Sequence, residues 1–110
     1  MKRTILGEDV HGVNIDLQTR CAHWHGHLDI IAIKFKCCGE WFPCFDCHAA
    51  EAGHAATVWP KEERNAIAVL CGACGGQLTI SEYLDCGSKC PKCASRFNPG
   101  CANHLHLYFE

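Results

Sequence analysis

The chain has 110 residues, of which eleven are cysteine and eight are histidine, and its formal net charge is −2 at pH 7. This length suits one domain, and so short a chain often needs disulfides or metal ions for stability. Its apolar residues are scattered and form no run near the roughly 20 residues of a membrane span. We therefore expect several small cores, each around a metal ion, and no contact with a membrane.

The charge balance also argues against nucleic acid as a partner. Three zinc ions bound by nine thiolates and three neutral histidines would add six positive and nine negative charges, which changes the net charge from −2 to −5. Phosphate backbones require a basic surface on the protein that binds them. The sequence thus predicts an acidic protein that binds metal and not DNA or RNA.

The cysteines could form disulfides or bind metal, and three observations favour metal. The basic start Met1-Lys2-Arg3 leads into Glu8 and Asp9 and not into an apolar signal segment. Cysteine is mixed with histidine at short spacings, and an odd number of cysteines would leave one thiol without a disulfide. We therefore expect zinc as the cofactor and the cytoplasm as the location.

The first half of the chain predicts short strands and one short helix. Residues 1–20 form a polar lead-in with a few apolar positions that indicate extended structure: Val10, Val13, Ile15 and Leu17. Residues 28–36 are rich in β-branched side chains and predict a strand. Residues 45–53 predict a short helix.

The second half has the same character. Residues 55–65 are rich in charged side chains and predict a solvated connector, and residues 66–70 predict a strand. Residues 79–84 begin with the spacing of a capping box and predict a short helix. Residues 105–109 predict a final strand.

Two Cys-x-x-Cys motifs in the second half predict a zinc ribbon. They are Cys71-Gly-Ala-Cys74 and Cys90-Pro-Lys-Cys93, separated by fifteen residues. This spacing is typical of a Cys₄ site, in which each motif places two thiolates about 2.3 Å from one ion. Backbone amides of the tight turns can then donate hydrogen bonds to the sulfurs. A thioredoxin-like redox motif would need a βαβ unit, which the sequence does not show.

The first half contains eight further cysteines and histidines, which is enough for two tetrahedral zinc ions. A Cys-x-His and a Cys-x-x-Cys clamp together predict a Cys₃His site: Cys21, His23, Cys44 and Cys47. The remaining four predict a Cys₂His₂ site: Cys37, Cys38, His48 and His54.

The pairing of ligands within this half is open. Adjacent residues point in different directions, so Cys47 and His48 can bind different ions. The same reasoning could separate Cys37 from Cys38 and exchange ligands between the two sites.

Several metal-binding side chains remain outside these three sets. Cys101-x-x-His104 has ligand spacing and could form a weaker fourth site, although a packed thiol and a surface histidine is the interpretation we favour. Cys86 is either a free thiol or an alternative ligand in the ribbon. His23, His25 and His27 would share one face of an extended segment, most simply as a solvated strand edge.

The order of these motifs resembles the CHY-type zinc finger family. The matching segments are Cys21-Ala-His23-Trp24, Cys37-Cys38, Cys44-x-x-Cys47-His48, His54, Cys71-Gly-x-Cys74, Cys90-Pro-x-Cys93 and Phe97-Asn98-Pro99-Gly100-Cys101. They cover about residues 10–109, and Trp24 stands where the family usually has tyrosine. The resemblance implies three structural zinc ions. It is strongest to stand-alone members, which include a group that helps small Tim proteins assemble in the mitochondrial intermembrane space, as well as bacterial proteins.

Together these features predict a small metal-stabilised α+β domain over residues 1–110. We expect short strands and turns around a two-zinc half at residues 10–65, followed by a zinc-ribbon half at residues 66–109. Catalysis is not expected, because all three sites can be closed by four ligands and the His-x-Glu part of the deaminase signature is absent.

The expected function is that of a monomeric protein-interaction or assembly-helper module with an unidentified protein partner. Two alternatives remain, namely zinc buffering or metal transfer, and participation in a thiol–disulfide relay. The intermembrane space is the alternative location.

Overall fold

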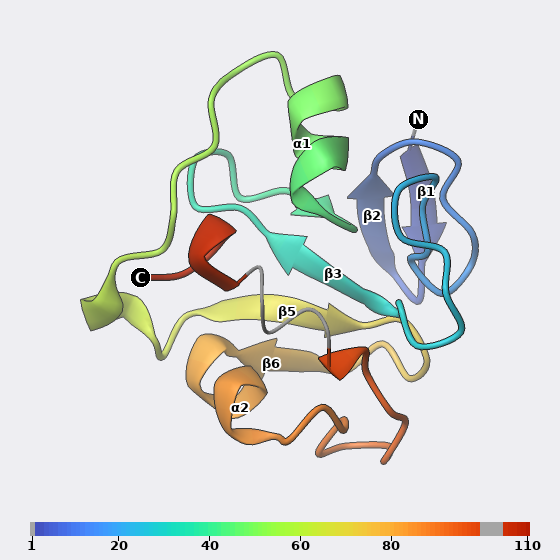
Figure 1. Ribbon diagram of the computed structural model, residues 1–110, viewed down its shortest axis with the longest axis vertical. Helices are drawn as coiled ribbons and strands as arrows, with labels where there is room; N and C mark the ends of the chain where they lie inside the picture. The colour runs from blue at the N-terminus through green and yellow to red at the C-terminus, as the bar shows by residue number, and fades with distance from the viewer. Residues whose placement is uncertain (1, 100–104) are drawn as a thin grey trace.

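The computed structural model describes residues 2–99 and 105–110, and a six-stranded sheet is its framework (Figure 1). The strand order is β1-β2-β4-β3-β5-β6. The strands are β1 (Lys2–Ile5), β2 (Glu8–His11), β3 (Ile31–Lys34), β4 (Trp41–Phe42), β5 (Ile67–Cys71) and β6 (Gln77–Thr79). Neighbouring strands are antiparallel except β2 and β4, which pair in parallel through Val10 and Trp41.

The centre of the sheet is buried on both faces. Side chains alternate across a strand, and in β3 the side chains of Ile31 and Ile33 join one buried cluster while Ala32 joins another on the opposite face. The larger cluster includes cysteines from the first and third predicted zinc sites, and Cys37 packs against it. The expectation of separate small cores around each metal is therefore wrong, because one core continues past all three sites.

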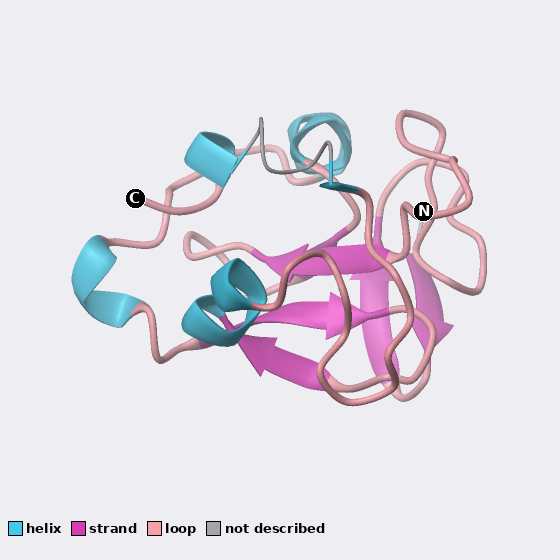
Figure 2. Ribbon diagram, turned by 60° about the horizontal axis from the view of Figure 1, so that its bottom comes forward, coloured by secondary structure: helices cyan, strands magenta, loops and turns pink. Residues whose placement is uncertain are grey.

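The helical segments are short and lie on the outside of the sheet (Figure 2). They are α1 (Phe45–Glu51), η1 (Lys61–Glu63) and α2 (Ile80–Asp85). The predicted capping box begins α2, since the Thr79 side chain accepts from the Glu82 amide and the Glu82 side chain accepts from the Thr79 amide. No helix in the described part of the chain has the length and apolar character to cross a bilayer.

The amino-terminal residues are more ordered than the predicted lead-in. Strands β1 and β2 form a hairpin that buries Ile5 and Val10 in the smaller cluster. Leu6 and Gly7 have positive φ angles of 50° and 93° at its turn, as a tight two-residue hairpin loop requires. Of the apolar positions named above, Val10 lies in a strand, whereas Val13, Ile15 and Leu17 lie in the loop that follows.

Other predicted elements differ from the structure in their bounds. The strand predicted at residues 28–36 is limited to β3, and the strand predicted at 66–70 is shifted by one residue to β5. Strands β4 and β6 were not predicted, since two or three residues carry too little periodicity. The predicted strand at 105–109 is wrong: Leu105–Leu107 form a 3₁₀ turn, and Phe109 makes a single bridge with Trp59.

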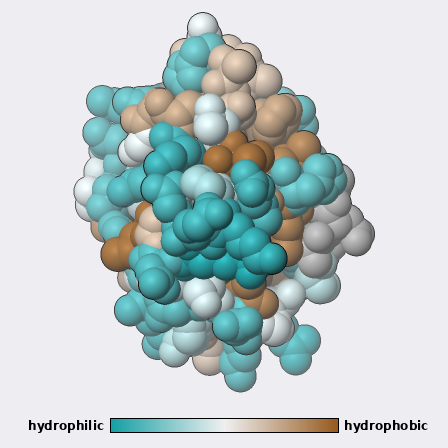
Figure 3. Space-filling view, turned by 90° about the vertical axis from the view of Figure 1, so that its left-hand side faces the viewer, coloured by the Kyte–Doolittle hydropathy of each residue, from teal (hydrophilic) through white to brown (hydrophobic). Residues whose placement is uncertain are grey.

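The predicted connector at 55–65 is only partly solvated. The side of the molecule that carries η1 is covered largely by hydrophilic side chains, with small hydrophobic areas between them (Figure 3). Within this segment, however, the Trp59 indole donates to the Lys34 carbonyl at 2.7 Å, and Glu63 pairs with Lys36 at 2.8 Å. These contacts attach the connector to the end of β3.

Strands β2 and β6, which are not neighbours in the sheet, are joined by a side-chain hydrogen bond. The Gln77 side-chain amide at the start of β6 donates to the Glu8 carboxylate of β2 at 2.6 Å. The hairpin turn also packs on the first ribbon knuckle, since a Cβ placed on Gly75 would lie 2.8 Å from that of Leu6. The amino-terminal hairpin is thereby attached to the ribbon.

Candidate metal centre

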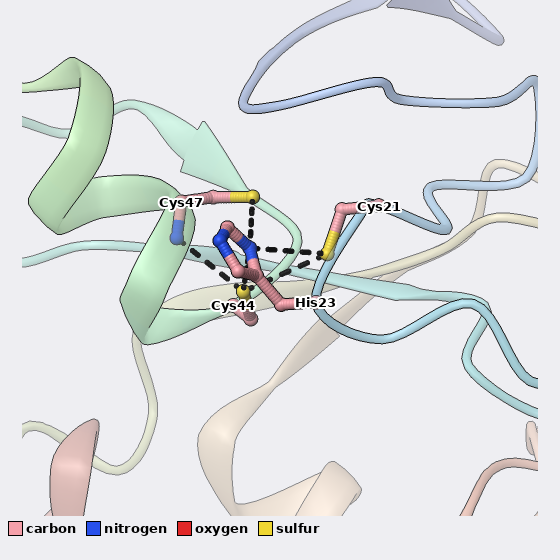
Figure 4. A group of neighbouring side chains, drawn as sticks. All are labelled: Cys21, His23, Cys44 and Cys47. Atoms are coloured by element: carbon pink, nitrogen blue, oxygen red, sulfur yellow. Dashed lines mark hydrogen bonds between the residues drawn. The ribbon is translucent and has the colours of Figure 1, made fainter.

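The first group of donor atoms joins a loop to the start of α1 (Figure 4). Its four members lie within 4.8 Å of one another: Cys21, His23, Cys44 and Cys47. The Cys21 and Cys44 sulfurs are 3.6 Å apart, and the His23 Nδ1 atom lies 3.4 Å from the Cys47 sulfur. The three cysteines are buried, whereas His23 is exposed.

Arg20 organises the loop that carries Cys21 and His23. Its guanidinium donates to the carbonyl oxygens of Gly26 at 2.8 Å and His27 at 2.7 Å, and it pairs with the Asp16 carboxylate at 3.2 Å. These contacts stabilise the loop and involve none of the metal-ligating atoms. No spacing rule in the sequence indicates this role, because it depends on contacts of one side chain with backbone carbonyls.

Backbone amides also surround the sulfurs of this group. Cys44 is the N-cap of α1, and its sulfur accepts from the Cys47 amide at 3.4 Å. The Trp24 amide donates to the Cys21 sulfur at 3.3 Å, and the Val13 amide to that of Cys47 at 3.4 Å. Hydrogen bonds to a sulfur and the position at a helix N-terminus both favour thiolate over thiol.

The second group lies between the turn after β3 and helix α1. Its members are Cys37, Cys38, His48 and His54. The Cys37 sulfur is 3.9 Å from the Cys38 sulfur, 3.2 Å from His48 Nε2 and 3.3 Å from His54 Nε2. Only His48 is buried, and its ring stacks on Phe35 with a centroid separation of 4.3 Å. With one exposed and two half-buried donors, this group is more open than the first.

The two imidazoles are held by different means. Burial lowers the pKa of His48, as does the nearby His54, so the neutral ring that can bind a metal is favoured. His54 Nδ1 lies 3.0 Å from the Ala52 carbonyl oxygen, which can orient the ring with Nε2 toward the group. A backbone carbonyl thus orients this histidine.

The third group is formed by the two ribbon knuckles: Cys71, Cys74, Cys90 and Cys93. Sulfur–sulfur distances are 3.8 Å between Cys71 and Cys93 and 3.9 Å between Cys74 and Cys90. The predicted amide contacts are present, since the Gly76 amide donates to the Cys74 sulfur at 3.3 Å and the Lys92 amide to that of Cys90 at 3.4 Å.

These groups suit zinc in donor type and in spacing. Tetrahedral Zn²⁺ with Zn–S bonds of about 2.3 Å separates two sulfurs by about 3.8 Å, close to the distances found here. A disulfide would require about 2.05 Å. Burial raises the pKa of Cys71 to about 12, whereas hydrogen bonds from Ser95 lower that of Cys93 to about 6. A buried thiolate such as Cys71 needs a neighbouring cation, which a bound metal supplies.

The structure brings together the same three sets of four side chains that the spacing predicts, and it keeps Cys37 with Cys38. The remaining candidates do not form another group within the described residues. The Cys86 thiol donates to the Tyr83 carbonyl at 3.0 Å. The segment with His25 and His27 is not a strand, so no shared histidine face forms. Cys101 and His104 lie outside the described residues.

Comparison with known proteins supports the zinc interpretation. Residues 21–99 match the CHY zinc finger family. The chain is 42% identical over 104 residues to Helper of Tim protein 13 of Saccharomyces cerevisiae, with 92% of this chain and 90% of that protein covered. It is 38% identical over 100 residues to Helper of Tim protein 13 of Kluyveromyces lactis, with 91% and 87% covered.

An uncharacterised protein of Schizosaccharomyces pombe is 37% identical over 102 residues, with 93% of this chain and 89% of that protein covered. No solved structure matches the chain. The family match, the relatives and three Cys/His groups compatible with three zinc ions agree. This zinc-binding chain therefore belongs to the CHY zinc finger family.

Proposed function

We propose that the chain is a non-catalytic assembly helper that binds a protein client and that uses three zinc ions to stabilise its fold. The observation that carries this proposal is its 42% identity, over nearly the full length of both chains, to a protein named Helper of Tim protein 13. A Tim protein is accordingly the client to test first. A monomer that binds neither nucleic acid nor membrane remains part of the proposal.

The site residues of the proposal are the twelve donors of the three groups. Each group offers four protein donors, and structural zinc sites are closed by four protein ligands, whereas catalytic zinc keeps a position for water. The presence of four protein donors in each group supports a structural role for all three ions.

The test is reconstitution with a defined client. Zinc-loaded protein should bind a purified, reduced Tim protein and raise the yield of its assembled complex, measured by size-exclusion chromatography. Protein treated with chelator is the control and should lose both effects. A zinc-loaded, folded protein that neither binds the Tim protein nor changes its assembly would contradict the proposed function.

A second function, metal exchange, is favoured by one observation. The second group has an exposed histidine, His54, and two half-buried cysteines, Cys37 and Cys38, so an ion bound there would be more accessible than one in the first group. Transfer of zinc to or from a client would distinguish this function, because a purely structural module keeps all its zinc while it assists assembly.

The location to test first follows from the relatives. Their name refers to Tim proteins, which makes the mitochondrial intermembrane space the first candidate and the cytoplasm the alternative. Protease protection of the native protein in intact mitochondria, before and after rupture of the outer membrane, would distinguish the two.

A further inference from the structure

The carboxyl-terminal segment, residues 105–110, contacts the helix that carries donors of two Cys/His groups. The Tyr108 hydroxyl accepts a hydrogen bond from the Phe45 backbone amide at 2.9 Å. Phe45 is the first residue of α1, and Cys44 is the N-cap of this helix. An amide in the first turn has no acceptor within its own helix, so a side chain from elsewhere can satisfy it. Here that side chain belongs to a residue 63 positions further along the chain.

The first turn of α1 supplies donors to both groups of the first half. Cys44 and Cys47 belong to the first group, and His48 belongs to the second. Within the turn, the Cys47 amide donates to the Cys44 sulfur at 3.4 Å, and the His48 amide donates to the Cys44 carbonyl at 3.2 Å. The hydrogen bond with Tyr108 holds the same turn from outside the helix, so it bears on the orientation of all three donors.

The Tyr108 ring reaches the second group through one intermediate ring. It meets Phe35 edge-on with a centroid separation of 5.6 Å, and Phe35 stacks on His48 with a separation of 4.3 Å. Both arrangements are favourable for aromatic rings. Phe35 and His48 are buried, so a change at Tyr108 reaches the His48 imidazole through packed side chains.

The position of Tyr108 is set by the connector beside it (Figure 1). The Trp59 amide donates to the Tyr108 carbonyl at 2.8 Å, and the Glu110 amide donates to the Trp59 carbonyl at 2.9 Å. The Trp59 indole in turn donates to the Lys34 carbonyl at the end of β3. The carboxyl-terminal segment follows the ribbon in the sequence, but these bonds attach it to the first half.

We propose that Tyr108 is a positioning residue for both Cys/His groups of the first half. Its hydroxyl holds the first turn of α1, which orients Cys44 and Cys47. Its ring holds Phe35 against His48. Tyr108 thereby determines how tightly the first and second metal ions are retained, although it does not bind metal itself. This inference rests on the proposed sets of zinc ligands and does not depend on the identity of a client.

The test is site-resolved release of metal from the full chain loaded with ¹¹³Cd²⁺ in place of zinc. Each bound ion gives one NMR resonance, and its chemical shift rises with the number of sulfur ligands. The Cys₃His, Cys₂His₂ and Cys₄ sites should therefore be resolved in one spectrum. The decay of each resonance after addition of excess chelator measures the release rate of that site.

Two variants separate the hydroxyl from the ring. Tyr108→Phe removes only the hydroxyl and should release the ion of the Cys₃His site about fivefold faster, as expected for one lost hydrogen bond. Release from the Cys₂His₂ site should then change by less than about twofold. Tyr108→Leu removes the ring as well and should speed release from both sites about fivefold or more. The Cys₄ site should keep its release rate in both variants.

The matched control is Thr79→Val, which removes a similar hydrogen bond from a different helix. The Thr79 hydroxyl accepts from the Glu82 amide at 3.1 Å in the first turn of α2, and none of the twelve donors lies in α2. This variant should lower the urea midpoint by about as much as Tyr108→Phe does. All three of its release rates should remain those of the unmodified chain, so the comparison separates loss of stability from loss of positioning.

Each outcome decides the proposal. Release from the Cys₃His site of Tyr108→Phe at the unmodified rate would overturn it. Equal acceleration at all three sites, or equal acceleration by Thr79→Val, would also overturn it, because Tyr108 would then act on global stability alone. Fewer than three cadmium resonances in the unmodified chain would contradict the ligand sets and with them the proposal. Three resonances with the expected rates would support it even if no Tim protein is bound, so its outcome is separate from that of the proposed function.

Discussion

The adjacent residues Cys47 and His48 of α1 direct their donor atoms into two different Cys/His groups. The Cys47 sulfur lies 3.4 Å from His23 Nδ1, and His48 Nε2 lies 3.2 Å from the Cys37 sulfur. One turn of helix therefore positions both groups of the first half. Disturbance of either group is expected to affect the other through α1.

Cysteines inside and outside the groups should differ in their effect on zinc content. We expect three zinc ions per chain, two after Cys74→Ser and three after Cys86→Ser, because the Cys86 thiol donates to the Tyr83 carbonyl and lies outside the three groups. Elemental analysis of protein purified without chelator measures this. Equal zinc loss in both variants would make Cys86 a ligand, and intact zinc content in the Cys74 variant would remove Cys74 from the ligand set.

Zinc should leave the second group before the first when a chelator is added. Its His54 is exposed and its cysteines are half-buried, whereas three of the four donors in the first group are buried. A colorimetric chelator should show a slow phase from the first group and an earlier phase whose amplitude His54→Ala reduces. A single phase that includes all the zinc would contradict this order of release.

Complete removal of zinc should unfold the protein. Structural zinc contributes on the order of 10 kcal/mol in small zinc-finger peptides, which is comparable to the total stability of an ordinary domain. Near-ultraviolet circular dichroism should lose the signal of buried Trp41 when excess chelator is present at neutral pH. A retained signal would mean that the core around the sheet is stable without metal.

The amino-terminal hairpin should contribute measurably to stability. Ile5 is 1% exposed and Leu6 is 57% exposed, so these adjacent residues form a matched pair. Ile5→Ala should lower the free energy of unfolding by about 2–4 kcal/mol, and Leu6→Ala should change it by at most about 0.5 kcal/mol. Urea titration of the zinc-loaded variants compares them, and similar midpoints would contradict the burial of the hairpin.

Gly72 should tolerate no side chain. A Cβ at this position would clash with the Gln18 carbonyl oxygen and lie 2.8 Å from that of Ile30, so Gly72→Ala should cost about 3 kcal/mol or more. Gly87 has a φ of 63° and open space where a Cβ would stand, so Gly87→Ala should cost only about 1 kcal/mol. The same titration ranks the two, and an equal cost would contradict the close packing of loop and knuckle.

The sequence predicted the chemistry of the site better than the path of the chain around it. Ligand spacing is a local property, so the three sets of donors followed from motifs such as Cys71-Gly-Ala-Cys74, and the family comparison confirms that the chain is a CHY zinc finger. That each of these donors binds zinc remains a prediction. The capping box at Thr79 was found for the same reason, because it also depends on residues close in sequence.

The elements that were missed depend on distant contacts. Strand β4 has two residues and exists because Trp41 and Phe42 pair with strands on both sides. The contact of Gln77 with Glu8 likewise joins residues that lie far apart in the sequence. No periodicity or spacing in the sequence indicates such contacts.

The strand order has a consequence for synthesis of the chain from its amino terminus. The hairpin with Val10 is made first, but the buried cluster on its apolar side is completed by Ala32 of β3, Trp41 of β4 and Leu70 of β5, which are made later. Until then the nascent chain exposes that side together with several unbound thiols. The hairpin therefore completes its packing during synthesis only after the first strand of the ribbon half has been made.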